Sequence, residues 1–335
     1  MKIAVIGSGA IGGLVAGYLK EKGEDVVLIG HADGIRPVKE NGLGISGVRG
    51  NFNVKLDVAE KLTFKPDLAI LTVKTQDLDA AIKDNLGFLK VCTVLTTQNG
   101  VQADNLAAKY ILPQNLVSGI VMFGATYLEA GKIVHNFEGG WIIGKISGET
   151  ADEKLALLQG VLNKIFPAVI ADDIRGMKYL KIFVNANNCI PAILGLSMQE
   201  AFKDLQVSRI SIRIWKEDLE VIKKSGIKLV SLPDFPLERL TKLAALADTE
   251  AAEIFSGIMV NLSKEPLYGS ILQSIKRKRP SEIDYINGEF VTLAKANGFN
   301  APLNQRLIEL VHKVEKSGNF LSKEDLLSAT SEVLN

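Results

Sequence analysis

The sequence is poor in the residues from which disulfides and zinc sites are built. Its 335 residues include two cysteines and three histidines, which are scattered along the chain. Neither a disulfide framework nor a metal site is expected from such a set. The chain also lacks a secretory signal and an apolar run of about 18 residues, the length that a membrane span requires. We therefore expect a cytoplasmic protein without metal and without a membrane partner.

The chain also lacks an excess of charge of either sign. Lys and Arg number 39 against 38 Asp and Glu, a formal net charge of +1. Proteins that bind nucleic acid or anionic membrane surfaces usually carry a basic excess, so no nucleic-acid partner is expected. A hydrophobic fraction of 47% allows sizeable cores, and the length of 335 residues suggests about two domains.

The strongest signal lies at the N-terminus, where residues 3–6 form an apolar, largely β-branched run typical of a buried parallel strand. The run leads directly into the pattern Gly7-x-Gly9-x-x-Gly12 and a predicted helix. In a dinucleotide-binding fingerprint the first glycine makes a tight turn, the second admits a pyrophosphate, and the third lets helix and strand pack closely. The predicted pyrophosphate-binding residues are Gly7, Ser8, Gly9, Ala10, Ile11 and Gly12. A glycine turn without a ligand is the alternative, but such a turn would not need the third glycine.

The end of the second predicted strand, residues 26–29, bears on the choice of cofactor. An acidic residue at this point usually binds the ribose 2′-hydroxyl of NAD. This chain instead has Gly30 and His31, followed by Arg36. We therefore expect NADP(H), with His31 or Arg36 near the 2′-phosphate, and NAD(H) is not excluded. An equal interpretation is that both side chains are solvated loop residues.

Two further strands are predicted to end in polar residues at the same edge of the sheet. Residues 67–74 end on Lys74, and residues 93–97 are followed closely by Asn99. Because ligands of open α/β sheets bind outside the carboxyl ends of the strands, Lys74 and Asn99 are candidate ligand contacts. A solvated Lys74 and a turn role for Asn99 are the alternatives. Short apolar runs over residues 117–144 predict antiparallel strands that complete this sheet.

The second half of the chain changes character, because its apolar residues recur at helical spacing without comparable strand runs. We therefore predict an α/β fold of the Rossmann type, a dinucleotide-binding domain over residues 1–172, followed by an all-α domain over residues 173–335.

The first helix of the second domain carries polar residues on an apolar surround. Lys181, Asn185 and Cys189 are four residues apart, which places them on one helix face with Asn188. Polar groups on such a face are costly to bury unless something pairs with them, so the face is a candidate binding surface. A face turned to solvent is the alternative.

A second polar stretch opens another predicted helix. Ser281 followed by Asp284 resembles a capping box, which would place Glu282 in the first helical turn. An acid there usually just compensates the helix dipole.

Taken together, these motifs resemble the ketopantoate reductase (2-dehydropantoate 2-reductase) family over nearly the whole chain. The resemblance is carried by Gly7-x-Gly9-Ala10-Ile11-Gly12, Val73-Lys74, Gln98-Asn99-Gly100, Lys181-x-x-x-Asn185, Ser270 and Pro280-Ser281-Glu282-Ile283-Asp284-Tyr285-Ile286-Asn287-Gly288. It implies a Rossmann domain followed by a helical domain, and NADPH-dependent reduction of 2-dehydropantoate to pantoate on the way to pantothenate and coenzyme A.

The resemblance also implies roles for individual residues. Lys181 matches the family's proton donor, and Asn185 and Ser270 match substrate-binding positions. Asn99 matches a contact to both cofactor and substrate, Lys74 lies toward the nicotinamide end, and Glu282 matches a carboxylate near the nicotinamide ribose. Cys189 stands where the family often has a second substrate-binding Asn, with Asn188 beside it as a further candidate substrate contact, and His31 stands where the family commonly has Arg.

Three functions remain open at this point. The first is a ketopantoate reductase, and the second is a related reductase of another 2-oxo acid; both bind a small-molecule 2-oxo acid and both allow a homodimer. The third is a non-catalytic dinucleotide-sensing protein. A sensor predicts a degraded catalytic set, whereas Lys181, Asn185, Ser270 and Glu282 are all present.

Overall fold

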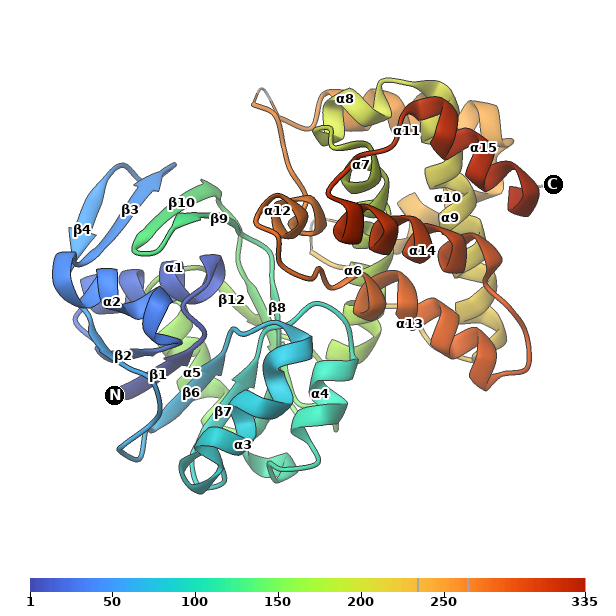
Figure 1. Cartoon of the computed structure of the whole chain (residues 1–335). Helices are drawn as coiled ribbons and strands as arrows, with labels where there is room; N and C mark the ends of the chain where they lie inside the picture. Colours follow the sequence, from blue (N-terminus) through green and yellow to red (C-terminus); the bar gives the residue numbers. More distant parts are fainter. Residues whose placement is uncertain (234, 264, 335) are drawn as a thin grey trace. The chain divides into compact units, whose positions relative to one another are not determined.

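In the computed structural model, which describes residues 1–233, 235–263 and 265–334, the chain folds as two units. The units are Met1–Arg175 and Gly176–Asn335 (Figure 1). The sequence prediction placed the division after residue 172. The first unit is α/β and the second is built from helices, so the predicted fold class is confirmed.

The first unit is organised around an eight-stranded sheet. In spatial order its strands are β12 (Ala168–Ile170), β11 (Trp141–Gly144), β8 (Leu116–Val121), β7 (Thr93–Thr96), β6 (Leu68–Leu71), β1 (Lys2–Ile6), β2 (Asp25–Ile29) and β5 (Asp57–Ala59). Neighbouring strands run parallel except β11 against β8. The central strands read as nearly continuous apolar runs because both faces of the sheet are covered.

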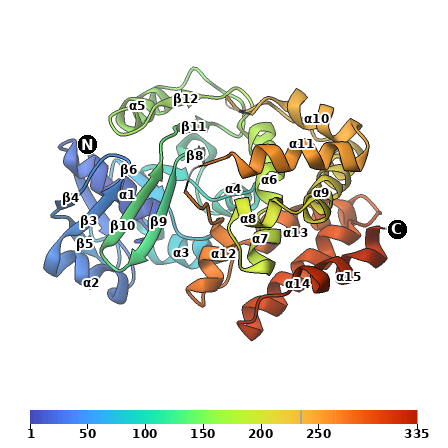
Figure 2. The same ribbon diagram turned by 90° about the horizontal axis from the view of Figure 1, so that it is seen from above.

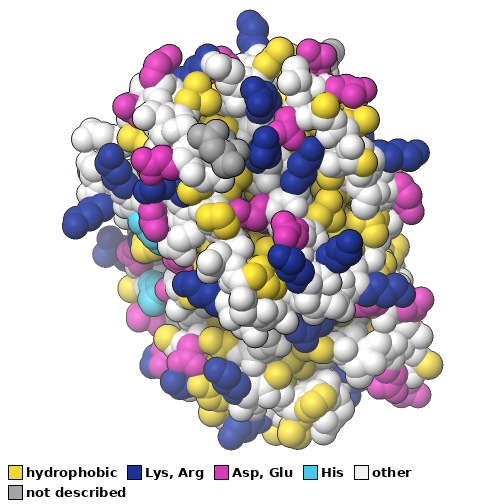
Figure 3. Space-filling model, turned by 90° about the vertical axis from the view of Figure 1, so that its right-hand side faces the viewer, with side chains coloured by type: hydrophobic (Ala, Val, Ile, Leu, Met, Phe, Trp, Pro, Cys, Tyr) yellow, Lys and Arg dark blue, Asp and Glu magenta, His cyan; other side chains and the backbone are white. Residues whose placement is uncertain are grey.

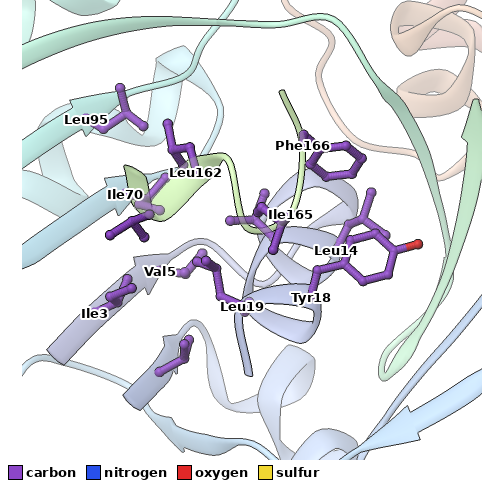
Figure 4. Close-up of a cluster of buried hydrophobic side chains, with 14 of the residues drawn as sticks. Ile3, Val5, Leu14, Tyr18, Leu19, Ile70, Leu95, Leu162, Ile165 and Phe166 are labelled. Atoms are coloured by element: carbon purple, nitrogen blue, oxygen red, sulfur yellow. The ribbon is translucent and has the colours of Figure 1, made fainter. Parts of the chain in front are cut away.

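Helices cover the two faces of this sheet. One face packs against α1 (Ala10–Glu21) and α5 (Glu153–Leu162), and Figure 4 shows Leu14 and Leu162 from these helices in one apolar cluster with Ile3 and Val5. The other face packs against α3 (Leu78–Leu89) and α4 (Gln102–Ala107). The remaining helical segments of this unit are α2 (Ala32–Asn41), η1 (Thr75–Asp77) and η2 (Pro113–Asn115).

A second, four-stranded sheet covers the outer side of α1. Its order is β4 (Phe52–Val54), β3 (Leu43–Gly47), β10 (Lys132–Phe137) and β9 (Gly124–Glu129), and Figures 1 and 2 both place β9 and β10 beside α1. The prediction that residues 117–144 complete the main sheet is therefore wrong in part. The strands β8 and β11 do join the main sheet, but β9 and β10 leave it, because α1 is also apolar on the side that faces away from the main sheet.

A buried hydrogen-bonded pair fixes this second sheet to α1. The Tyr18 hydroxyl lies 2.8 Å from His135 Nδ1, and His135 Nε2 lies 3.0 Å from the Phe137 carbonyl oxygen. A carbonyl oxygen only accepts, so Nε2 carries the proton and Nδ1 accepts from Tyr18. Burial lowers the pKa of His135. The lowered pKa favours the neutral imidazole, which has one N–H donor and one acceptor nitrogen, as these two hydrogen bonds require.

The second unit packs around one long helix, α9 (Leu205–Lys224). Apolar residues recur along it at three- and four-residue spacing, and the indole N–H of Trp215 donates to the Phe183 carbonyl oxygen at 2.9 Å. The other helices are α6 (Ile174–Ala186), α7 (Cys189–Leu194), α8 (Met198–Phe202), α10 (Leu237–Ala245), α11 (Asp248–Val260), α12 (Ser270–Lys276), α13 (Ile283–Ala296), α14 (Pro302–Ser317) and α15 (Lys323–Leu334).

The distribution of charge on the surface and the hydropathy of the helices agree with the near-zero net charge and the short apolar runs of the sequence. Figure 3 shows acidic and basic side chains interspersed over the face that it displays. Across the described ranges, no helix combines the length and the apolar character needed to cross a membrane.

The Tyr18–His135 pair generates a stability prediction. Tyr18→Phe leaves the buried Nδ1 of His135 without its donor, so we expect a loss of about 1–3 kcal/mol in the free energy of unfolding. The matched control is Tyr110→Phe, which removes a 2.6 Å hydrogen bond to Asp79 at a partly exposed site. Water can replace that bond, so the control should lose less than about 1 kcal/mol. Urea unfolding of both variants measures the difference, and equal losses would contradict the role given to His135.

Candidate functional site

The turn after β1 has a geometry that requires glycine. Gly7 has a φ of +122°, which L side chains rarely adopt, and its N–H donates to the Ile29 carbonyl oxygen at 2.8 Å. A Cβ at Gly7 would lie 2.6 Å from the backbone nitrogen of Val73. Gly12 is equally enclosed, because a Cβ there would lie 1.8 Å from the Gly7 carbonyl oxygen. The turn and the first turn of α1 are therefore in direct backbone contact.

Gly9 is different, because a Cβ at this position would meet no atom within 4 Å. Protein atoms therefore pack tightly around Gly7 and Gly12, whereas there is free space beside Gly9. Gly9 is also the N-cap of α1, whose first turn contains no acidic residue. The first intrahelical N–H is that of Gly13, which donates to the Gly9 carbonyl oxygen at 2.8 Å, so the preceding N–H groups are available to an anion. These features fit a dinucleotide pyrophosphate.

Ser8 connects this turn to the segment after β2. A Cβ on Gly30 or on Gly34 would lie 2.5 or 2.6 Å from the Ser8 hydroxyl oxygen, so Ser8 packs closely against both glycines. His31 is the N-cap of α2, and His31 and Arg36 are exposed. The predicted 2′-phosphate contacts therefore lie in a segment that packs against the glycine turn. The first carboxylate after β2 is Asp33, already inside α2.

Two residues that the sequence prediction did not assign connect the ends of three neighbouring strands. The Thr72 hydroxyl lies 3.0 Å from the Ile6 carbonyl oxygen and 2.9 Å from that of Gly7, which connects β6 to β1. The buried Gln98 amide donates to the carbonyl oxygens of Leu71 and Val73, at 2.9 and 2.8 Å, which connects β7 to β6. The available signal for both was a polar residue within two positions of the end of a buried strand.

These bonds hold the predicted residues of the first unit at one edge. Ile6 pairs with Leu71 and Leu71 with Thr96, so the strands β1, β6 and β7 end together. Lys74 follows β6 as the N-cap of η1, and Asn99 follows Gln98. Both side chains are half-buried. The structure thus brings the glycine turn, Lys74 and Asn99 to the carboxyl edge of the sheet, where ligands of such folds bind.

In the second unit, α6 carries Lys181 and Asn185 one helical turn apart, and both are half-buried. Burial lowers the pKa of Lys181 to about 8, from an ordinary value of 10.5. An ammonium with that pKa gives up its proton near neutral pH far more readily than an exposed lysine, as a general acid must.

The prediction of one helix that carries Lys181, Asn185 and Cys189 on one face is wrong. The helix α6 ends at Ala186, and Cys189 is the first residue of α7. Its thiol is fully buried, its pKa is raised by that burial, and it lies 3.1 Å from the Ala186 carbonyl oxygen. Pro191 explains the interruption, because it has no N–H to donate to Asn187, whose carbonyl oxygen accepts from Ile190 instead.

The break between α6 and α7 places the candidate residue Asn188 next to the segment that precedes α12. Asn188 lies in the break, and a Cβ on Gly269 would lie 3.3 Å from the Cβ and Cγ of Asn188. Gly269 is the N-cap of α12 and directly precedes Ser270, whose side chain is exposed. The structure therefore brings Asn188 close to the backbone that carries Ser270.

The predicted capping box at Ser281 is also wrong. Glu282, not Ser281, is the N-cap of α13, with no side-chain cap hydrogen bond. Asp284 instead lies 3.0 Å from Nε2 of His312, whose Nδ1 lies 2.9 Å from Glu315. Glu315 also accepts the N–H of Ser281 at 2.8 Å. The start of α13, with the half-buried Glu282, is thus in contact with α14, and the Ser281 hydroxyl also accepts the Ile283 N–H at 3.4 Å.

Comparison with known proteins decides the family. The model described as ketopantoate reductase PanE/ApbA matches residues 3–148, and that described as ketopantoate reductase PanE/ApbA C terminal matches residues 173–315. The chain belongs to the ketopantoate reductase family. The 2-dehydropantoate 2-reductase of Pyrococcus horikoshii is 32% identical over 95% of this chain and 99% of its own, and that of Pyrococcus abyssi is 28% identical over 93% and 97%.

Solved structures are also similar to this chain, and one of them contains a bound dinucleotide. One similar structure is that of D-mandelate dehydrogenase with NADH and anilino(oxo)acetate, which has a TM-score of 0.80 and is 26% identical to this ketopantoate reductase family member. The match covers 96% of this chain and 100% of the D-mandelate dehydrogenase chain. The resemblance noted from the motifs is therefore confirmed at the level of family and fold.

The open Gly9 position generates a prediction that separates binding from folding. Gly9→Ala meets no protein atom, so the free energy of unfolding should stay within about 0.5 kcal/mol of the wild-type value, while the methyl group obstructs the dinucleotide and weakens its binding. Gly12→Ala clashes with backbone and should lose about 3 kcal/mol or more of stability. Urea unfolding and fluorescence titration with NADPH test both variants. Unchanged NADPH affinity in Gly9→Ala would contradict the assignment.

Proposed function

We propose that this protein reduces 2-dehydropantoate to pantoate with NADPH, using Lys181 as the proton donor. The observation that carries the proposal is the position of Lys181 on α6, half-buried and with a pKa of about 8, one turn before Asn185. Family membership supports the reaction class, because similar curated proteins are named 2-dehydropantoate 2-reductase.

The chemistry needs a hydride and a proton. NADPH, when bound, supplies the hydride to the ketone carbon. As the carbonyl oxygen gains negative charge, the Lys181 ammonium donates a hydrogen bond to it and then the proton, which leaves a neutral amine and a hydroxyl group. Lys181 regains its proton from solvent. The acid is therefore restored after each turnover.

The other candidate residues bind and orient. The N–H groups at the start of α1 hold the pyrophosphate, and Lys74 and Asn99 contact the nicotinamide end. Glu282 accepts hydrogen bonds from ribose hydroxyls. The substrate is held by Asn185, Asn188 and Ser270, whereas the buried Cys189 supports the break between α6 and α7 and contributes no hydrogen bond to the substrate.

The choice of NADPH rests on the segment after β2. The first carboxylate after this strand is that of Asp33. His31 and Arg36, which lie on either side of Asp33 in the sequence, are both exposed. A 2′-phosphate would meet the guanidinium of Arg36, which can bind it with two hydrogen bonds, and the imidazole of His31. NADH is the alternative cofactor, because the similar D-mandelate dehydrogenase structure contains it.

A second candidate function is reduction of another 2-oxo acid. The similarity to D-mandelate dehydrogenase favours it, as does the presence of Cys189 in place of a second asparagine. A non-catalytic sensor is disfavoured because Lys181, Asn185, Ser270 and Glu282 are all retained.

A substrate and cofactor panel tests the proposal directly. NADPH oxidation should show a higher kcat/KM with 2-dehydropantoate than with phenylglyoxylate or 2-oxoisovalerate, and NADPH should be used better than NADH. Arg36→Ala should reduce the preference for NADPH, with Lys39→Ala, one turn further along α2, as the control. Higher kcat/KM with phenylglyoxylate would favour the second candidate, and equal use of NADH would overturn the cofactor assignment.

The role of Lys181 makes a kinetic prediction. Lys181→Ala should lower kcat by about 10²–10⁴-fold, the usual contribution of a general acid, with little change in NADPH affinity. Lys178→Met, one turn earlier on α6 at a buried position, is the control and should retain kcat once its folding is verified. The assignment fails if Lys178→Met is the crippled variant.

The pH profile gives an independent readout of the same residue. Because only the protonated amine can act as the acid, kcat/KM for reduction should fall above a pH of about 8, and not above about 10 as for an exposed lysine. The decline should be absent from the residual activity of Lys181→Ala.

A further inference from the structure

Asn287 makes a set of buried hydrogen bonds that the proposed reaction does not use. It lies on α13, is fully buried, and its Nδ2 is 3.1 Å from the Ala186 carbonyl oxygen and 2.9 Å from Asn304 Oδ1. The Cys189 sulfur lies 3.8 Å from the same nitrogen. The amide has two hydrogens, and two oxygen acceptors face them. Only the donor end of the side chain fits here, which fixes its orientation.

The hydrogen bonds continue into the core of the helical unit. Asn304 Nδ2 donates to Asp218 Oδ1 at 2.7 Å and to Glu217 Oε1 at 2.8 Å. Glu217 also accepts the backbone N–H groups of Leu303 and Asn304, so it caps the start of α14. Asp218 is fully buried, and burial raises its pKa well above the ordinary value. These hydrogen bonds thus connect Asn287 on α13 to two other helices, α14 and α9.

The other end of this set of bonds is the last residue of α6. Helix ends leave carbonyl oxygens without intrahelical partners, and that of Ala186 accepts from the Cys189 thiol and from Asn287. Ala186 stands between Asn185 and the break that carries Asn188. Burying an amide side chain costs free energy unless its hydrogen bonds are made, whereas burying an apolar side chain does not. If position 287 had only to fill space in the core, an apolar residue would be sufficient.

We propose that Asn287 is a positioning residue for the substrate, which acts by holding the Ala186 carbonyl and thereby the Asn185–Asn188 segment in its binding geometry. The inference rests on the substrate roles of Asn185 and Asn188 in the proposed function. It assigns no contact between Asn287 and the substrate. Its effect is transmitted through the backbone at the end of α6.

Asn287→Leu tests the proposal, because it removes the donor and preserves the size of the side chain. We expect KM for 2-dehydropantoate to rise about tenfold or more, since small displacements of binding groups are costly, while the Kd for NADPH stays within about twofold. Asn287→Asp keeps one hydrogen-bond donor when its carboxyl group is neutral, so KM for 2-dehydropantoate should rise less than in Asn287→Leu. This second variant keeps the test decisive if Asn287→Leu folds poorly.

The matched control is Asn85→Ala in the other unit. Asn85 is also a buried amide with two backbone partners, the N–H of Leu62 at 2.7 Å and the carbonyl oxygen of Ala81 at 2.8 Å. Its loss should lower stability and leave KM for 2-dehydropantoate unchanged. An equal rise of KM in Asn85→Ala, or normal KM in both folded Asn287 variants, would overturn the proposal.

A double-mutant comparison shows whether Asn287 acts through the substrate residues. If it does, Asn287→Leu should raise KM much less when Asn185 and Asn188 are already alanine, because there is less binding left to misalign. A full additional rise would show an independent effect and contradict the inference. If the Asn185→Ala and Asn188→Ala changes themselves leave KM unchanged, the substrate site of the proposed function fails, and that result is distinguishable from a failure at Asn287 alone.

Discussion

The first unit depends on the close approach of α1 to the carboxyl ends of β1 and β6. A single Cβ at Gly12 would lie 1.8 Å from the Gly7 carbonyl oxygen and 2.4 Å from the Thr72 hydroxyl oxygen, so the helix packs directly against the glycine turn and against the residue that follows β6. This contact sets where α1 begins and which way its N–H groups point. It also lets Thr72 reach the Gly7 carbonyl oxygen, which connects the glycine turn to the next strand. The geometry for binding an anion is therefore a consequence of helix packing.

Local sequence signals predicted this part of the molecule well, because the chemistry of each residue decides its own conformation there. The φ of Gly7, the start of α1 and the burial of β1 and β6 follow from the residues at those positions. The four-stranded sheet was missed for a different reason. Its strands β9 and β10 have the same short apolar pattern as β8 and β11, and which sheet they join depends on the apolar outer side of α1, more than a hundred residues earlier in the chain.

In the helical unit, the spacing predicted one continuous helix, and the structure has two. The four-residue interval from Lys181 to Asn185 holds, but the next interval to Cys189 crosses the end of α6. Pro191, which has no N–H to donate to Asn187, lies just beyond the break. The carbonyl oxygen of Ala186, the last residue of α6, accepts a hydrogen bond from Asn287, which lies on a helix about a hundred residues later. Sequence spacing cannot show such a long-range contact.

The lowered pKa of Lys181 relates the stability of the fold to the proposed reaction. A lysine whose folded pKa is about 8 binds fewer protons in the folded state than in the unfolded state between pH 8 and 10.5, so stability increases with pH over that interval. Below pH 8 the charged amine is buried at a cost on the order of a few kcal/mol. A 2-oxo acid brings a carboxylate, and an anion beside the ammonium favours the charged form. In the proposed reaction, a substrate carboxylate beside Lys181 would therefore offset this cost and keep the proton on the amine.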